Sequence, residues 1–185
     1  MENSPTVYHE RQKKMLCGLH VLNNLFQEGL FTQSDLDDIC NRLTPSRVFN
    51  PHKSVLGLGN YDINVITSAL QSKTLCLIWF DRRKDVKCIN TDQIKGFILN
   101  VPTDFKLGFV KVPFMDFKHW YVVRKVGELY YNLDSKLPKP DELGTNEEML
   151  NFVSEKLTAS ESHLLLVVEP DIEKDGSWYR EDPKS

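Results

Sequence analysis

The spacing of hydrophobic residues changes from helical to strand-like near residue 74. Before that point, apolar residues recur three and four positions apart in three segments, which predicts three helices. The first begins at or near Cys17 and is apolar on most of its circumference, so we expect it in the middle of the fold. The second and third carry N-terminal capping signals, namely Thr32 with Asp35 and then Asp62.

A long segment, residues 44–61, joins the second and third predicted helices. It contains Pro51, Gly57 and Gly59, and its length is typical of a mobile or functional connection. Two helices that flank such a connection can form an arm.

After residue 74, β-branched and aromatic residues gather in short runs that predict strands. A capping box at Thr145 opens one more helix before the last strand. The expected strands are residues 75–80, 97–101, 109–114, 119–126, 128–133 and 164–168. Because helices come first and a mostly antiparallel sheet follows, the sequence predicts an α+β fold. The charged segment after Pro170 is expected to be loosely held, except around Trp178.

Composition and charge narrow the classes of function. The 185 residues fit a single domain, which we place at residues 1–170, followed by a charged C-terminal tail at residues 171–185. The net charge of -3 and the scattered Lys and Arg residues argue against a nucleic-acid partner. Neither a signal peptide nor an apolar run of about 20 residues is present, so we expect a cytosolic protein. The four cysteines form no CxxC pair, and we expect thiols rather than disulfides or a zinc site.

Cys17 is the first candidate for chemistry. It follows an extended lead-in, residues 1–15, and stands where free backbone N–H groups and the helix dipole favour a thiolate. Lys13 and Lys14 add positive charge, so we expect a lowered thiol pKa. The side-chain amide of Gln12 can reach the same place as the Cys17 backbone N–H, and such a pair forms an oxyanion hole. A buried, inert cysteine is the alternative, and a base elsewhere is needed to overturn it.

A base and an orienting group come from a predicted hairpin that turns around Val126 and Gly127. If the loop is centred between those two residues, His119 lies directly opposite Asp134 and within hydrogen-bonding reach. A loop one residue longer or shorter would remove Asp134 from that position. Each residue alone could be structural, as a strand histidine or a turn-forming aspartate. Together with Cys17, we interpret them as the base and orienting acid of a nucleophilic cysteine site.

His20 is a rival base, because it lies one helical turn after Cys17. Its neighbours at helical spacing are polar, which favours a buried and hydrogen-bonded structural role instead. Those neighbours are Asn23, Asn24 and Gln27. The remaining histidines are assigned no chemistry: His9, His52 and His163.

Several separated motifs together resemble the Josephin domain, and look most like its short, stand-alone members. They are Tyr8-His9-Glu10 with Gln12, Leu16-Cys17, His20, Leu22-Asn23-Asn24, residues 59–66, His119-Trp120 and residues 130–135. The likeness extends over about residues 8–168. It implies a papain-like cysteine deubiquitinase with Cys17 as nucleophile, His119 as base, Asp134 as orienting residue and Gln12 as oxyanion-hole donor. It also implies that residues 31–70 project as a hairpin arm beside the cleft.

The sequence departs from the family pattern at two positions. Asp134 stands where ataxin-type members have asparagine, and a carboxylate should stabilise an imidazolium at least as well. Gly18 stands where a larger small residue is common. Glycine weakens a helix by up to about 1 kcal/mol relative to alanine, but lets a substrate backbone approach closely.

The resemblance implies hydrolysis of the isopeptide or peptide bond after the C-terminus of ubiquitin, through a thioester on Cys17. It implies no metal or organic cofactor. The expected partners are ubiquitin and ubiquitinated proteins, with no nucleic acid, no direct membrane insertion and a monomeric protein. Two alternatives stay open: an acyl transferase with the same Cys-His-Asp residues, and a ubiquitin-binding module with low or partner-gated activity.

Overall fold

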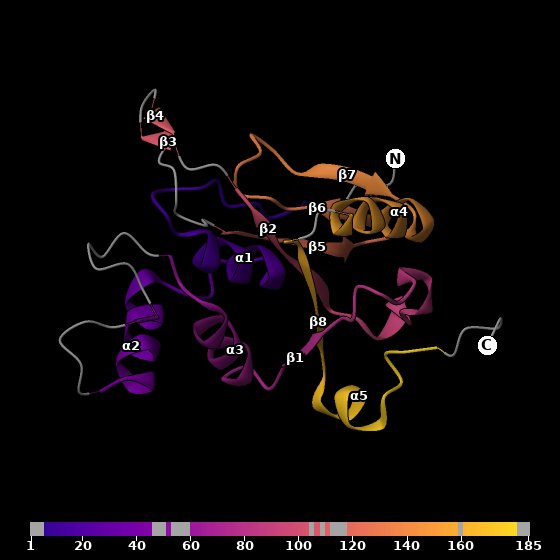
Figure 1. The fold of residues 1–185 in the computed structure, drawn as a ribbon, viewed down its shortest axis with the longest axis horizontal. Coiled ribbons are helices and arrows are strands. Elements are labelled where there is room, and N and C mark those ends of the chain that lie inside the picture. Colours follow the sequence, from indigo (N-terminus) through magenta and orange to yellow (C-terminus); the bar gives the residue numbers. More distant parts are fainter. Residues whose placement is uncertain are drawn as a thin grey trace.

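The computed structural model describes residues 6–45, 51–52, 60–103, 106–107, 110–111, 118–158 and 161–180. Within these ranges, six strands form an antiparallel sheet in the order β1-β8-β2-β5-β6-β7 (Figure 1). They are β1 (Cys76–Trp79), β2 (Gly96–Pro102), β5 (Lys118–Val126), β6 (Leu129–Asn132), β7 (Asp141–Gly144) and β8 (His163–Val168). A separate pair consists of β3 (Lys106–Leu107) and β4 (Val110–Lys111).

Helices cover both faces of the sheet, which is the α+β arrangement that the sequence predicts. The α-helices are α1 (Cys17–Phe26), α2 (Gln33–Leu43), α3 (Ile63–Gln71), α4 (Asn146–Leu157) and α5 (Pro170–Asp175). The 3-10 turns are η1 (Val86–Cys88) and η2 (Thr91–Gln93). No helix in the described ranges has the length and apolar character needed to cross a bilayer.

Predicted caps set the starts of α2, α3 and α4. Thr32 and Asp35 form a reciprocal capping box at α2, and Thr145 and Glu148 form another at α4. The carboxylate of Asp62 accepts hydrogen bonds from two backbone N–H groups in the first turn of α3. These side chains satisfy donors that a helix start otherwise leaves unpaired, and so fix where each helix begins.

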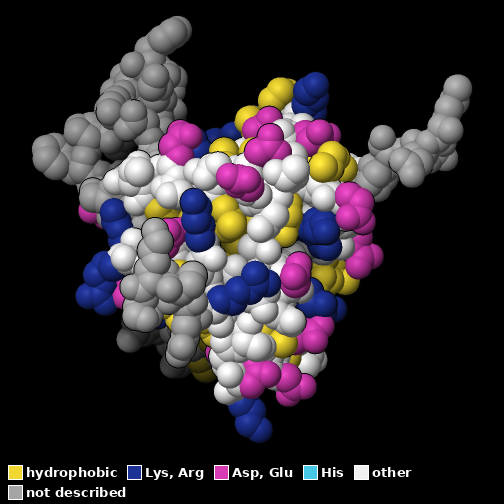
Figure 2. Space-filling view, turned by 90° about the vertical axis from the view of Figure 1, so that its right-hand side faces the viewer, with side chains coloured by type: hydrophobic (Ala, Val, Ile, Leu, Met, Phe, Trp, Pro, Cys, Tyr) yellow, Lys and Arg dark blue, Asp and Glu magenta, His cyan; other side chains and the backbone are white. Residues whose placement is uncertain are grey.

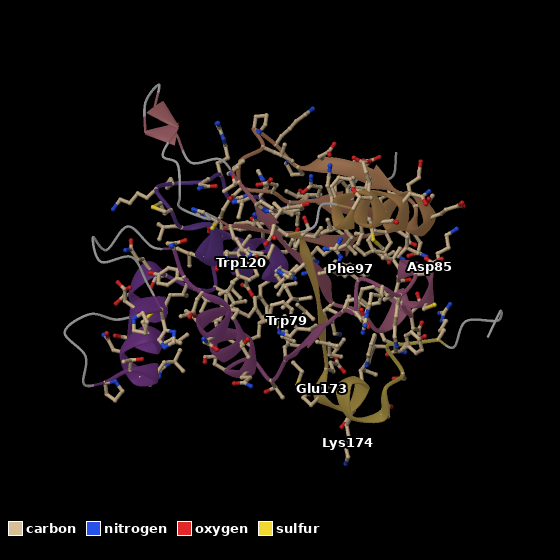
Figure 3. The ribbon with its side chains drawn as sticks, in the orientation of Figure 1. Trp79, Asp85, Phe97, Trp120, Glu173 and Lys174 are labelled. Carbon is tan, nitrogen blue, oxygen red and sulfur yellow. The ribbon has the colours of Figure 1, made fainter. Side chains whose placement is uncertain are left out.

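The side chains of the sheet alternate between two hydrophobic layers. One layer joins Trp120, Leu165 and their neighbours to α1, α2 and α3, and the other joins Phe97, Leu166 and their neighbours to α4 and η1. Figure 3 shows Trp120 beside α1 and Phe97 on the side of α4. The period of two along each strand therefore places α1, with Cys17 at its start, against one face of the sheet.

The hairpin between β5 and β6 has a different register from the predicted one. Val126 pairs with Leu129, so its two-residue turn consists of Gly127 and Glu128, one position later than expected. Gly127 has a φ of 62°, which glycine adopts readily, and it occupies the first central position of the turn, as in type II′ turns. The prediction was wrong because hydrophobic alternation alone does not fix the centre of a turn.

The new register still leaves Asp134 on the same face as His119. The pairing continues past β6, since the Leu133 N–H donates to the Val122 carbonyl, and this places Asp134 opposite Tyr121. Moving the turn by one position shifts the pairing by two residues, and an even shift preserves the face. Direct opposition was therefore wrong, but diagonal neighbours are also within reach of each other.

α2 lies at the outer edge of the molecule and packs on α3, which contacts α1 and β1 (Figure 1). Most of the predicted connection between α2 and α3, residues 46–50 and 53–59, lies outside the described residues. Where it is described, His52 Nδ1 lies 2.7 Å from the Asp62 carboxylate at the start of α3. Most of the strand expected at residues 109–114 also lies outside the described residues.

The segment after Pro170 is held more firmly than expected. α5 begins at Pro170 and ends at Asp175, and the following Gly176 has a φ of 74°. Beyond it, the Asn90 N–H donates to the Trp178 carbonyl at 2.8 Å, and Tyr179 forms a β-bridge with Ile89. The expectation of a loose tail was therefore wrong for the helix at residues 170–175, where helix-capping signals outweigh the high charge, whereas the contacts around Trp178 agree with the exception made for that residue. On the face that Figure 2 presents, Lys and Arg side chains lie among Asp and Glu.

Candidate active site

The start of α1 leaves its first backbone N–H groups unused. Cys17 is the first residue of the helix, and Leu16 at the N-cap supplies no side-chain cap. Among the described residues, none accepts a hydrogen bond from the N–H of Cys17 or Gly18. The Cys17 side chain is buried, with 5% of the residue exposed. A thiol at this position faces free donors and the positive end of the helix dipole, both of which favour negative charge.

His119 and Asp134 form the second half of the site. His119 is 3% exposed on β5, and its Nε2 lies 2.6 Å from Asp134 Oδ1. The other ring nitrogen, Nδ1, is then the one available to Cys17, which lies close enough to influence the pKa of His119. The ring of Tyr121 stacks on the imidazole at a centroid distance of 6.0 Å. The structure thus brings together three residues that the sequence proposes as a unit.

The electrostatics of the pair favour a charged imidazole. Burial by itself would lower the pKa of His119, but the hydrogen bonds to Asp134 and Cys17 outweigh it and raise the pKa above its ordinary value. Burial likewise opposes ionisation of Asp134, yet contact with His119 and a backbone N–H from Lys136 lower the pKa of the carboxyl. A thiol beside such an imidazole can transfer its proton to the ring and act as a nucleophile.

Gln12 lies at the loop that carries Asp134. Its backbone N–H donates to the Ser135 carbonyl at 2.7 Å, and Ser135 Oγ lies 3.4 Å from Gln12 Oε1. The side-chain amide donates to the Lys14 carbonyl at 3.1 Å, within the turn that leads into α1. Lys14 itself has a φ of 53°, which bends the chain sharply just before Cys17.

Comparison with known proteins decides the family. A sequence profile of the Josephin family matches residues 12–168 of the chain. This chain belongs to the Josephin family. It is 46% identical to human Josephin-2 over 178 residues, which cover 96% of this chain and 94% of that protein. It is 48% identical to a Josephin-like protein of Drosophila melanogaster over 176 residues, covering 94% of this chain and 79% of the relative.

Human ataxin-3 is a more distant relative of this Josephin. The two are 28% identical over 186 residues, which cover 90% of this chain and 46% of ataxin-3. The α+β arrangement, with the helix of Cys17 packed against an antiparallel sheet that carries His119, agrees with the papain-like fold that the resemblance implies.

His20 has the structural role that the sequence favours. It is buried, and its Nδ1 lies 2.6 Å from the Glu10 carboxylate while its Nε2 accepts the Lys13 backbone N–H at 3.2 Å. Both ring nitrogens are engaged, so neither is available to take a proton from Cys17.

Gly18 in this Josephin lies against Tyr61, just before α3. A Cβ added at Gly18 would lie 3.1 Å from the Cβ of Tyr61, which is tighter than ordinary van der Waals contact. The hydroxyl of Tyr61 in turn donates to Asp37 of α2 at 3.1 Å. Tyr61 therefore occupies the space beside Gly18 that the sequence suggested for a substrate backbone. The missing side chain of Gly18 allows α1 to pack closely against Tyr61, which in turn contacts α2.

None of the four cysteines, all of which lie within the described ranges, is in a disulfide. Cys40 and Cys88 are buried in the two hydrophobic layers or beside them. A hydrogen bond to Glu173 and burial raise the pKa of Cys76 to about 11, which disfavours its thiolate. The residues that the structure describes include no group of three or more His, Cys, Asp or Glu side chains placed to hold a metal ion.

Sequence reasoning missed the contribution of two residues near the site. His9 was assigned no chemistry, yet its Nε2 lies 2.9 Å from the backbone carbonyl of Asp134. Glu10 belongs to the motif that carries the resemblance but was given no role, yet it contacts His20 and Asn23 on α1. The polar stripe on an otherwise apolar helix was the signal, because buried polar groups require partners from elsewhere in the chain.

Proposed function

We propose that this Josephin is a deubiquitinating cysteine protease that hydrolyses isopeptide or peptide bonds at the C-terminus of ubiquitin. The observation that carries the proposal is the contact of Cys17, at the uncapped start of α1, with a His119 imidazole held by Asp134. Membership of the Josephin family supports ubiquitin as the substrate, through the resemblance of the motifs around these residues. We further propose a monomeric, cytosolic enzyme.

The proposed reaction has two steps. The Cys17 thiolate attacks the carbonyl carbon of the last ubiquitin residue, the carbon–nitrogen bond breaks, and His119 gives its proton to the leaving amine. Water, deprotonated by His119, then cleaves the thioester and releases the ubiquitin carboxylate and the free thiol. The Cys17 backbone N–H and the Gln12 amide are proposed to stabilise the oxyanion in both steps.

The proposal is tested by mixing the purified protein with ubiquitin that carries a thiol-reactive group at its C-terminus, and by measuring the intact mass. We expect a covalent adduct with the parent protein and none with Cys17→Ala. Cys76→Ala is the matched control, because it removes a half-buried thiol away from His119 and should leave the adduct intact.

The other outcomes distinguish the alternatives. An adduct that persists in Cys17→Ala contradicts Cys17 as the nucleophile. Binding of ubiquitin in a titration without any adduct would favour the ubiquitin-binding module. Absence of both adduct and binding would overturn ubiquitin as the substrate.

A further inference from the structure

The lead-in segment, which we define as residues 8–13, runs antiparallel to α1 before the chain turns into that helix (Figure 1). At one end the Tyr8 N–H donates to Gln27, just beyond the last turn of α1, at 3.0 Å. At the other end the Lys13 N–H donates to His20 in the first turns at 3.2 Å. The lead-in segment therefore contacts α1 along its length and carries Gln12 next to its last contact.

Glu10 stands at the centre of these contacts. Its Oε1 accepts the Tyr8 hydroxyl at 2.7 Å and the Asn23 amide at 2.9 Å, and its Oε2 lies 2.6 Å from His20 Nδ1. The backbone N–H of Glu10 donates to Asn24 Oδ1 at 2.6 Å. Four groups thus hold one residue against the helix that begins with the nucleophile.

The direction of the hydrogen bonds requires a carboxylate at position 10. His20 Nε2 accepts the Lys13 N–H, so the ring proton of the neutral imidazole is on Nδ1 and points to Glu10. The Asn23 amide is also a donor toward Glu10. Burial opposes ionisation of Glu10, but these hydrogen bonds hold its pKa below the ordinary value. A glutamine would bring its own N–H group against a donor and leave at least one contact broken.

The opposite side of the lead-in segment is tied to the loop of the orienting acid. His9 Nε2 lies 2.9 Å from the Asp134 carbonyl, and the Gln12 N–H donates to the Ser135 carbonyl at 2.7 Å. The segment therefore lies between the helix of Cys17 and the loop of Asp134. Any displacement of its backbone moves Gln12 relative to both.

We propose that Glu10 is a positioning residue, which holds the lead-in segment between α1 and the Asp134 loop and thereby places the Gln12 amide for the oxyanion. The role rests on the proposed deubiquitinase function. It assigns the hydrogen-bonded network of Glu10, His20 and Asn23 to transition-state stabilisation through Gln12 rather than to packing alone.

The first test compares the parent protein with Glu10→Gln on ubiquitin that bears a fluorogenic C-terminal amide. We expect kcat to fall at least about tenfold, toward the loss of about 100-fold to 1000-fold seen when an oxyanion-hole donor is removed. KM should change by less than about threefold, because the oxyanion exists only in the transition state. Glu28→Gln, which removes an exposed carboxylate just after α1, should leave kcat unchanged. A kcat of Glu10→Gln within about twofold of the parent overturns the proposal.

A double-mutant cycle with Gln12→Ala tests whether Glu10 acts through Gln12. If it does, adding Glu10→Gln to Gln12→Ala lowers kcat by less than about twofold, because the positioned group is already absent. Losses that multiply in the double variant show that Glu10 acts independently of Gln12, and overturn the proposal.

Alkylation of Cys17 by iodoacetamide, followed by peptide mass across a pH series, separates positioning from general damage. This displacement needs Cys17 and His119 but no oxyanion donor, so its pH profile should be the same in Glu10→Gln and the parent. A shifted profile means that the whole site is disturbed, and contradicts the positioning role. If Glu10→Gln does not fold, Tyr8→Phe is the substitute, because it removes one hydrogen bond to Glu10. Tyr8→Phe should lower kcat by a smaller factor than Glu10→Gln. This loss should also disappear when Gln12→Ala is already present.

The two proposals fail in different ways. A parent protein that does not hydrolyse the ubiquitin amide overturns the deubiquitinase function and this role with it. An active parent whose Glu10→Gln variant is equally active overturns only the positioning role.

Discussion

At the scale of single residues, His119 and Asp134 set each other's protonation. The short contact between Nε2 and Oδ1, 2.6 Å, raises the pKa of the imidazole and lowers that of the carboxyl against the effect of burial. The same contact leaves Nδ1 for Cys17, so a single hydrogen bond both orients the ring and favours its charged form.

This pairing predicts the pH dependence of the proposed hydrolysis. The imidazolium must be present to protonate the leaving amine, so kcat/KM should decline as pH rises through the pKa of His119, above the ordinary value of 6.5. Asp134→Asn removes the carboxylate that stabilises the imidazolium, and should move this decline to lower pH. The pH at which kcat/KM declines is measured on a ubiquitin amide for the parent protein and for Asp134→Asn. Asp141→Asn, which removes an exposed carboxylate, is the control and should leave the profile unchanged. An unmoved profile in Asp134→Asn would contradict the assignment.

Asn24 should contribute to stability as well as to the site. It is fully buried, accepts the Glu10 N–H at 2.6 Å and donates to the Leu133 carbonyl at 2.9 Å. Asn24→Leu leaves both backbone groups unpaired, and the free energy of unfolding should fall by about 3 kcal/mol in urea denaturation. The exposed Asn151→Leu on α4 should stay within about 0.5 kcal/mol of the parent. Equal stability of the two variants would show that the Asn24 contacts do not matter.

At the scale of elements, the helix starts divide into capped and uncapped ones. α2, α3 and α4 are preceded by the N-cap residues Thr32, Asp62 and Thr145, whose side chains accept hydrogen bonds from free N–H groups of the first turn. α1 begins at Leu16 and Cys17 without such a side chain, so its donors remain available to a bound anion. The helix is held instead by its burial against the sheet and by the lead-in segment.

The packing of α1 on the sheet depends on Gly96. A Cβ at this position would lie 2.4 Å from Leu25 Cδ1 and 3.2 Å from Val122 Cγ2. Gly96→Ala should therefore lower the free energy of unfolding by about 1–3 kcal/mol, measured by urea denaturation. In a Leu25→Ala background the clash is relieved. Gly96→Ala should then lower the free energy of unfolding by less, because the effects of neighbouring substitutions are not additive. Additive effects would contradict the contact.

At the scale of the whole molecule, the sheet separates two hydrophobic layers. The central strands β8, β2 and β5 are covered on both faces, by α1 and α3 on one side and by α4 and η1 on the other. β7 at one edge is exposed to half-buried, and α5 has no buried residue. Cys17 and His119 belong to different elements, which only this layered packing brings together.

Hydrogen exchange should follow the same layering. The slowest amides should belong to β2, β5 and β8, because exposing them requires opening both layers, whereas β7 and α5 should exchange faster. Amide exchange of the intact chain followed by mass spectrometry measures the difference. Protection of α5 equal to that of β8 would contradict this hierarchy.

The sequence by itself determined the features that depend on neighbouring residues. The caps at Thr32, Asp62 and Thr145, the start of the first helix at Cys17 and most strands follow from side chains within a few positions of each other. The face shared by His119 and Asp134 was also determined, because the period of two survives an even shift in register.

Only the tertiary structure decided the features that depend on distant or finely balanced contacts. The centre of the hairpin turn rests on the left-handed conformation of Gly127, which hydrophobic alternation does not specify. The contacts of the Glu10 carboxylate and the proximity of Cys17 to His119 depend on partners far along the chain. Local patterns specify which surfaces a segment must bury, whereas the partner that covers each surface is selected when all the elements pack together.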